Sequence, residues 1–227
     1  MRFLKYLCPP VALVLLAVPA YAALITFSSR GTFNSSVPGL PVETFEAGLV
    51  APGGLTLCNG PLSSSAASAC FPLGGLLPGV TYSAVPGPAM VVLGAAFDGI
   101  GNASKVLGPD VFADTFNLTF TGVTGVGFDV FPGPVAGNIL ISVFSPTNVA
   151  LGSFTTAGVV GGSFFGVLST TGQIGRVNIA SQAAIPGELI DNLAFGTPVP
   201  EPSSLLLLAG GLAIIFRLRF LGKREAD

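Results

Sequence analysis

Carboxylates are the residues most able to do chemistry in this 227-residue chain, because it contains no histidine. Without an imidazole there is no Ser-His-Asp or Cys-His catalysis and no histidine metal ligand. Two pairs of carboxylates are close in sequence, Asp110 with Asp114 and Glu43 with Glu46. A glycosidase needs two carboxyl groups that face each other across a sugar. These pairs are local, and the chain has no Trp for sugar stacking, so we expect no enzymatic activity.

Calcium binding is a second use of carboxylates, since calcium prefers hard oxygen ligands. Glu46 follows Phe45 early in the chain, and Asp191 lies between Ile190 and Asn192 near the end of its central part. This pattern resembles jelly-roll carbohydrate-binding modules, in which a structural calcium often joins an early Glu to a late Asp. The resemblance implies a candidate calcium site at Glu46 and Asp191. Alternatively, Asp191 and Asn192 bond backbone N–H groups at a strand end.

The charge balance of the central part excludes one class of partner. Residues 23–197 contain three basic and eight acidic side chains, a net charge of −5. Nucleic acid is a poor partner for such a surface. One tyrosine, Tyr82, remains in this part of the chain, which argues against a flat aromatic platform for sugars. Residues 98–102 (DGIGN) form a further oxygen-rich loop with a weaker signal for a cation.

The first 22 residues predict a secretory signal peptide. Arg2 and Lys5 precede an apolar stretch, and Ala20 and Ala22 supply small residues for cleavage by signal peptidase after Ala22. We expect Cys8 to be removed with this segment.

Two cysteines, Cys58 and Cys70, then remain in an exported chain, with eleven residues between them. This spacing indicates a disulfide that closes a surface loop. Two thiols without histidine fall short of a zinc site, so we expect no zinc.

Period-two patterns predict a single all-β domain over residues 23–196. The segments are separated by Gly, Pro or Asn, as in an antiparallel β-sandwich, and the 18 Phe residues suggest a Phe-filled core. A long irregular loop is expected between Pro72 and Pro88. The expected strands are 116–121, 126–131, 139–144, 150–155, 163–168, 177–180 and 189–195.

The C-terminal end has three parts. Residues 197–204 are a proline-rich linker, in which proline excludes helix and holds Glu201 in an extended, accessible backbone. Residues 205–221 are apolar apart from Arg217 and Arg219, whose long side chains can reach the lipid head groups, and predict a transmembrane helix of roughly 25 Å at about 1.5 Å per residue. Residues 222–227 are a basic tail that the positive-inside rule places in the cytoplasm.

This tail resembles the PEP-CTERM sorting signal of Gram-negative bacteria. The resemblance is carried by Val199, Pro200, Glu201 and Pro202, by the apolar helix with Gly210 and Gly211, and by the basic residues Arg217, Arg219, Lys223 and Arg224. Leu218 interrupts the usual run of adjacent arginines. The resemblance implies processing by exosortase, a membrane-embedded transpeptidase, and an association with exopolysaccharide. The order of apolar segments in residues 120–196 is also similar to the jelly-roll bodies common among such proteins.

These observations predict an exported, non-catalytic surface or extracellular-matrix protein. We expect it to be anchored at the periplasmic side of the inner membrane and then moved to the cell surface or released. The alternative is a carbohydrate-binding module or glycan-active enzyme of the extracellular polysaccharide.

Overall fold

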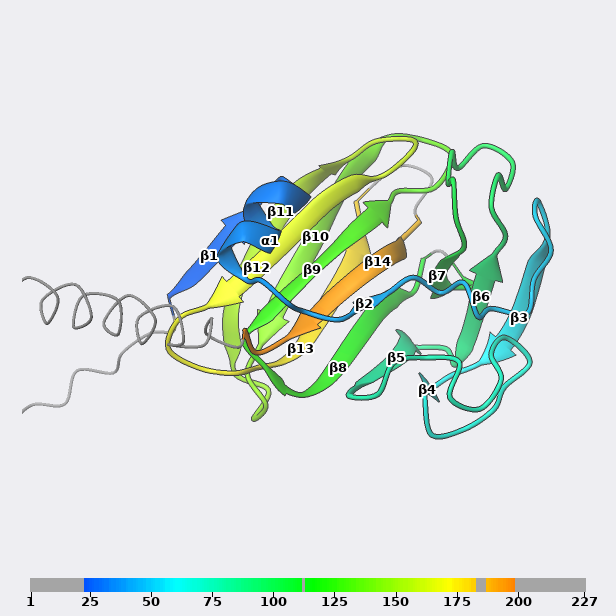
Figure 1. Ribbon diagram of the computed structural model, residues 1–227. Helices are drawn as coiled ribbons and strands as arrows, with labels where there is room; N and C mark the ends of the chain where they lie inside the picture. Colours follow the sequence, from blue (N-terminus) through cyan, green and yellow to red (C-terminus); the bar gives the residue numbers. More distant parts are fainter. Residues whose placement is uncertain (1–22, 112, 183–186, 199–227) are drawn as a thin grey trace, which may run out of the picture.

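Two antiparallel β-sheets face each other across an apolar core in the computed structural model, which describes residues 23–111, 113–182 and 187–198 (Figure 1). The sequence prediction of an all-β antiparallel fold with two sheets is confirmed. The elements are β1 (Leu24–Phe27), α1 (Arg30–Ser36), β2 (Val42–Glu43), β3 (Leu55–Asn59), β4 (Leu62–Ser63), β5 (Val80–Val85), β6 (Ala89–Leu93), β7 (Val106–Pro109), β8 (Thr115–Val123), β9 (Gly125–Phe131), β10 (Gly137–Phe144), β11 (Ala150–Gly158), β12 (Ser163–Ser169), β13 (Ile174–Ser181) and β14 (Leu189–Gly196).

The first sheet has the strand order β1-β12-β9-β14-β7-β6-β3, and β2 also pairs with β14. The second sheet has the order β11-β10-β13-β8-β5-β4. Neighbours in the first sheet are often far apart in sequence, as for β1 with β12. The sandwich therefore forms only when the two halves of the chain come together.

The seven strands expected between residues 116 and 195 are all present, as β8 to β14. Their alternation directs one face inward: on β8, Phe116, Leu118 and Phe120 are buried, while Thr115, Asn117 and Thr119 lie on the outer face. The period of two in the sequence therefore marks the boundary between core and surface in this half of the chain.

The N-terminal half contains more structure than the sequence predicts. The expected irregular loop between Pro72 and Pro88 includes β5, in which Val80, Tyr82 and Ala84 are buried. The expectation of a loop holds for residues 72–79 and is wrong for β5, whose alternating pattern is only six residues long and is enclosed by Gly and Pro. The helix α1 also was not predicted, and its seven residues are too short to show a helical period.

The outer face of the first sheet is covered by two separate segments. The helix α1 lies over β12, where buried Phe33 packs against Phe27 and Phe164. A Cβ atom added at Gly127 or Gly166 would lie 2.8 or 2.7 Å from the ring of Phe33, so these glycines allow the close approach.

The loop of residues 94–104 provides the second cover. Phe97 and the buried Ile100 pack there with side chains of β6, β7, β9 and β14. The central strands of the first sheet (β6, β7, β9 and β14) are therefore buried on both faces, whereas the second sheet leaves its outer face to solvent.

Some predictions fall on residues that the structure does not describe. The signal peptide (1–22) and the apolar helix with its basic tail (205–227) lie outside the described residues. In the part of the chain that is described, no helix is both long and apolar enough to cross a membrane. The described sandwich begins with β1 at Leu24 and its last strand, β14, ends at Gly196.

Candidate functional site

A network of charged and polar side chains lies on the outer face of the first sheet. Asp129 on β9 and Asp191 on β14 are directly opposite each other in the register of the two strands. Like charges at such positions repel each other. The pair is compensated by Arg30, whose guanidinium Nη2 lies 2.9 Å from Asp129 Oδ1 and donates to the backbone oxygen of Asn192 at 3.0 Å.

A β-bulge in β14 brings a further side chain into this network. The register shifts between Asp191 and Ala194, and Asn192 has a φ of 50°, a left-handed conformation that Asn tolerates better than most residues. The Asn192 side-chain amide donates to Asp129 Oδ2 at 3.0 Å and to Asp191 Oδ2 at 3.1 Å. The bulge thus places an uncharged donor between the two carboxylates.

The segment that follows the 94–104 loop completes the network. Ser104 donates its hydroxyl hydrogen to Asp191 Oδ2, and the backbone N–H of Lys105 donates to Glu46 Oε1 at 3.1 Å. The Lys105 ammonium group donates to the backbone oxygens of Glu46 and Gly48 at 2.8 and 3.0 Å. Ser104 and Lys105 therefore connect the two carboxylates that the sequence predicts as calcium ligands.

The electrostatics of Asp191 show that Glu46 lies close enough to influence it. Asp191 is only 1% exposed, and burial raises its pKa to about 6. The hydrogen bonds from Ser104 and Asn192 oppose this rise, whereas the charges of Asp129 and Glu46 add to it. The structure thus brings Glu46 and Asp191 into one network.

The arrangement does not fit a calcium ion well. Calcium takes six to eight oxygen ligands, but the oxygens of Asp191 and Asp129 and Oε1 of Glu46 already accept hydrogen bonds or an ion pair from the chain's own donors. Among the described residues, no group of three or more His, Cys, Asp or Glu side chains is arranged to hold a metal. The backbone N–H of Asn192 donates to Asp191 Oδ1 at 2.6 Å, the type of bond expected from the alternative interpretation.

Glu43 and Asp114, two further carboxylates named in the sequence analysis, hold loops in place. Glu43 accepts backbone hydrogen bonds from Phe45 and Leu77, and Asp114 accepts one from Gly87. In the 98–102 loop, the buried Asn102 donates to the backbone oxygens of Gly94 and Ser104. These contacts give the side chains structural roles.

Glu188 is a buried carboxyl group that sequence reasoning missed. It is 2% exposed, and its Oε1 accepts a hydrogen bond from the backbone N–H of Ser181 at 3.1 Å. Its Oε2 has no hydrogen-bond partner among the residues that the structure describes. Burial raises the pKa of Glu188 to about 7, and the charge of Asp114 adds to the rise.

Cys58 on β3 and Cys70 form a disulfide with a Cα–Cα distance of 5.7 Å. Both residues are buried, and the bond ties an edge strand to the loop that follows β4. Disulfides of this kind persist in oxidising compartments outside the cytoplasm.

The two ends of the described chain lie at the same end of the sandwich (Figure 1). The backbone N–H of Thr170 donates to Ala23, that of Ser169 to Thr124, and that of Thr124 to Gly196. A short series of neighbouring backbone bonds therefore joins the start of β1 to the end of β14. The chain leaves this end through Thr197 and Pro198.

The tail that begins there matches the family described as the PEP-CTERM protein-sorting motif, at residues 198–220. Residues 198–220 are a PEP-CTERM sorting motif. Processing by exosortase follows from this family. No curated protein matches the chain. Of the PEP-CTERM motif, only Pro198 is described; Val199, Pro200, Glu201 and Pro202, together with Arg217, Arg219, Lys223 and Arg224, lie outside the described residues.

The network contains four side chains that the sequence did not indicate: Arg30, Ser104, Lys105 and Asp129. One signal was available, because Asp129 interrupts an otherwise apolar strand, GVGFDVF. An acidic residue in such a strand needs a partner. The sequence cannot say that this partner is Arg30, 99 positions earlier.

We expect Arg30→Gln to lower the free energy of unfolding by about 2 kcal/mol, because it removes a charged hydrogen-bond donor from the partly buried Asp129 carboxylate and from the backbone oxygen of Asn192. Urea denaturation of the exported chain measures the change. Asn34→Ala, at an exposed position of the same helix, is the control. An equal loss in both variants, or a wild-type melting temperature that rises with added calcium and falls with chelator, would contradict internal pairing of the network.

We also expect stability to decrease as pH rises from about 5 to 8. The folded-state pKa of Glu188 is raised from 4.5 to about 7, so the folded chain holds a proton that the unfolded chain has released. The shift corresponds to a stabilisation of about 3 kcal/mol, which is fully present below pH 4.5 and is lost as pH rises through 7. The raised pKa of Asp191, about 6, adds a stabilisation of the same sign.

Denaturation at a series of pH values tests this expectation. Glu188→Gln should remove most of the decrease, whereas Asp98→Asn, at an exposed carboxylate, should keep the wild-type profile. A wild-type stability that is constant or increases over this range would show that the Glu188 interpretation is wrong.

Proposed function

We propose that this chain is an exported, non-catalytic surface or extracellular-matrix protein with a jelly-roll-like body that exosortase processes at its C-terminal end. The observation that carries the proposal is the PEP-CTERM motif at residues 198–220, which begins two residues after β14 ends. The sorting signal thus follows the folded body almost without a spacer.

Features of the body support export. A buried disulfide requires an oxidising compartment to form and persist, and cleavage of residues 1–22 by signal peptidase would deliver the body there. The apolar segment at 205–221 would then hold the precursor at the periplasmic side of the inner membrane. Processing would transfer the body to the cell surface or the medium.

The use of the carboxylates supports a non-catalytic role. Glu43, Asp114, Asp129 and Asp191 accept hydrogen bonds from the chain itself and so hold loops and strands in place. General acid–base catalysis needs such groups to be free for a substrate. The body is therefore proposed to act through its surface, in contact with exopolysaccharide.

A second candidate function, binding of carbohydrate, is favoured by the outer face of the second sheet. A row of uncharged polar side chains crosses five neighbouring strands in register. It consists of Ser83, Asn117, Asn178, Ser142 and Ser153.

Contacts within and beside this row organise it. The Asn178 amide donates to Asn117 Oδ1 at 2.9 Å, and the Ser142 and Ser153 hydroxyl oxygens are 2.9 Å apart. Arg176 donates to the same Asn117 Oδ1 and lies 3.8 Å from the ring centroid of Phe144. Amides, hydroxyls and a guanidinium are groups that can hydrogen-bond to sugar hydroxyls. Tyr82 is 0% exposed, so it is not available for stacking on a sugar.

The sorting proposal predicts that Glu201→Gln blocks processing, because the change alters the centre of the motif that the transpeptidase reads. In a bacterium that contains exosortase, the variant should accumulate as full-length precursor, whereas Glu225→Gln, outside residues 198–220, should be processed like wild type. Immunoblots and mass spectrometry of the C-terminus provide the measurement. Equal processing of the two variants would refute the sorting role of the motif.

The carbohydrate proposal predicts that the wild-type chain co-sediments with the exopolysaccharide of its own bacterium. Replacing Asn117 and Asn178 together by Ser should reduce the bound fraction several-fold, because two amides in the row are lost. Thr32→Ala, on the exposed side of α1, should leave binding unchanged. No co-sedimentation of wild type would leave only the structural role.

A further inference from the structure

The strand β3 forms one edge of the first sheet. It pairs with β6 from Leu55 opposite Leu93 to Asn59 opposite Ala89, and no described strand pairs with its other side. Figure 1 shows β3 at the outer edge of the sheet, at the end of the sandwich away from β1. An unpaired edge presents backbone groups that can pair with another chain.

The hydrogen bonds on either side of β3 show which backbone groups face outward. Gly60 donates to the backbone oxygen of Pro88 at 2.6 Å, and Gly94 donates to that of Gly54 at 2.8 Å. In an antiparallel ladder, alternate residues bond to the partner strand and the others point away from it. Because even-numbered residues bond to β6, the N–H and C=O groups of Leu55, Leu57 and Asn59 point to the free edge.

The side chains of these outward-facing residues are unusually apolar for an exposed edge. Leu55 is 52% and Leu57 is 53% exposed. Soluble proteins commonly protect edge strands with charges, and especially with Lys. Here no charged residue occurs between Glu46 and Asp98. The strand itself therefore carries no charge that would repel another strand.

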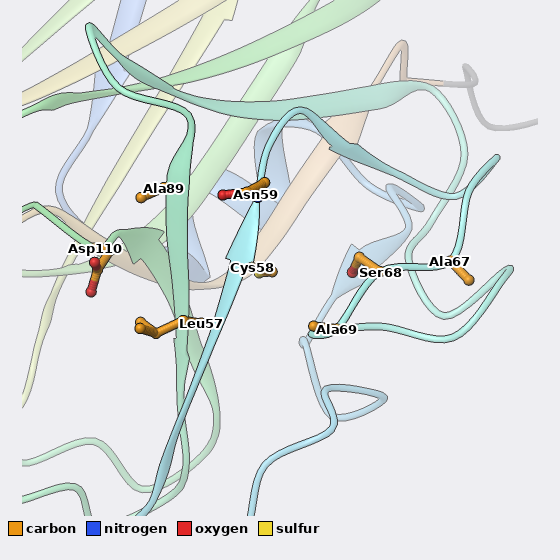
Figure 2. A pocket seen from close by; sticks show the side chains of 8 residues that line it. All are labelled: Leu57, Cys58, Asn59, Ala67, Ser68, Ala69, Ala89 and Asp110. Atoms are coloured by element: carbon orange, nitrogen blue, oxygen red, sulfur yellow. The ribbon is translucent and has the colours of Figure 1, made fainter.

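A hollow surrounds part of the strand, between the neighbouring strands and the loop of residues 67–69. The hollow, of about 520 Å³, is lined by Leu57, Cys58 and Asn59 of β3, and Figure 2 shows the small residues Ala67, Ser68 and Ala69 on the loop beside the strand. Ala89 and Asp110 complete the lining on the side of the neighbouring strands (Figure 2). The disulfide from Cys58 to Cys70 fixes the position of the strand relative to this loop.

The geometry of β3 is also self-complementary. A second copy related by a two-fold axis through Leu57 would pair antiparallel, with Leu57 opposite Leu57 and Leu55 opposite Asn59 of the other copy. Three outward-facing residues on each strand would exchange about six backbone hydrogen bonds. The Leu55 and Leu57 side chains of both copies would then lie on one face of a continuous sheet. Such an isologous contact closes after two copies.

The other long edge strand lacks these features. The strand β11 at the edge of the second sheet is also uncharged, but its exposed side chains include Ser153 and Thr155, and Leu151 and Phe154 pack against the core. It therefore presents a polar edge. At β3, by contrast, the leucines are exposed, and the backbone of the middle residue, Leu57, faces the free edge.

We propose that two copies of this chain dimerise by antiparallel pairing of their β3 strands about Leu57. The partner is a second copy because the edge matches itself in hydrogen-bond phase, in apolar side chains and in absence of charge. This inference does not depend on exosortase processing or on carbohydrate binding.

Cysteine substitution in the full exported chain tests the geometry. Across such a pair the two Cα atoms at position 57 are about 5.5 Å apart, within the range of a disulfide. Leu57→Cys should give several-fold more disulfide-linked dimer on non-reducing gels than Leu73→Cys or Thr155→Cys. Leu73 is 70% exposed in the same uncharged stretch, and Thr155 is exposed on the other edge. Peptide mapping should place the bond between the two substituted positions.

Placing a charged side chain at position 57, on the two-fold axis, provides an independent test. Sedimentation of the purified full chain should show a dimer for wild type and for Leu73→Lys. It should show a monomer for Leu57→Lys, because two ammonium groups would meet across the axis. A monomeric wild type, a Leu57→Lys dimer, or equal cross-linking at the three cysteine positions would each overturn the proposal.

Discussion

The burial of the central strands of the first sheet on both faces is the constraint on which the rest of this structure depends. Its inner face packs against the second sheet, and its outer face must be covered by parts of the chain outside the sheets. The helix α1 covers one region through Phe33, and the 94–104 loop covers another through Ile100. Glycines at 127 and 166 exist in the sheet because the Phe33 ring lies where their side chains would be.

The polar network is best understood from this arrangement. Arg30 is the first residue of α1, and Ser104 and Lys105 follow the 94–104 loop, so both covers contribute to it. Asp129 and Asp191 come from the sheet between them. The network joins the two covers to the sheet with hydrogen bonds. Its members are donors and acceptors for each other, which is why carboxylates that resemble ligands serve the fold.

The sequence predicts the C-terminal half of the fold well and the N-terminal half poorly, for a physical reason. The strands β8 to β14 are long enough for a period of two to stand out, and most have one face in the core and one in solvent. Strands such as β2 and β4 have two residues each and carry no period. The sequence also singles out Glu46 and Asp191 as candidate ligands. Their partners in the structure, Lys105 and Ser104, come into contact with them only in the folded chain.

The tail and the start of the body share one end of the sandwich, where Ala23, Thr124 and Gly196 lie along neighbouring backbone bonds. Whatever enzyme acts on either terminus therefore works at the same pole of the molecule. The strand β3 and its disulfide lie at the opposite pole. Under the processing proposed above, trimming either terminus would change what the protein is fastened to, while the surface around β3 would stay the same.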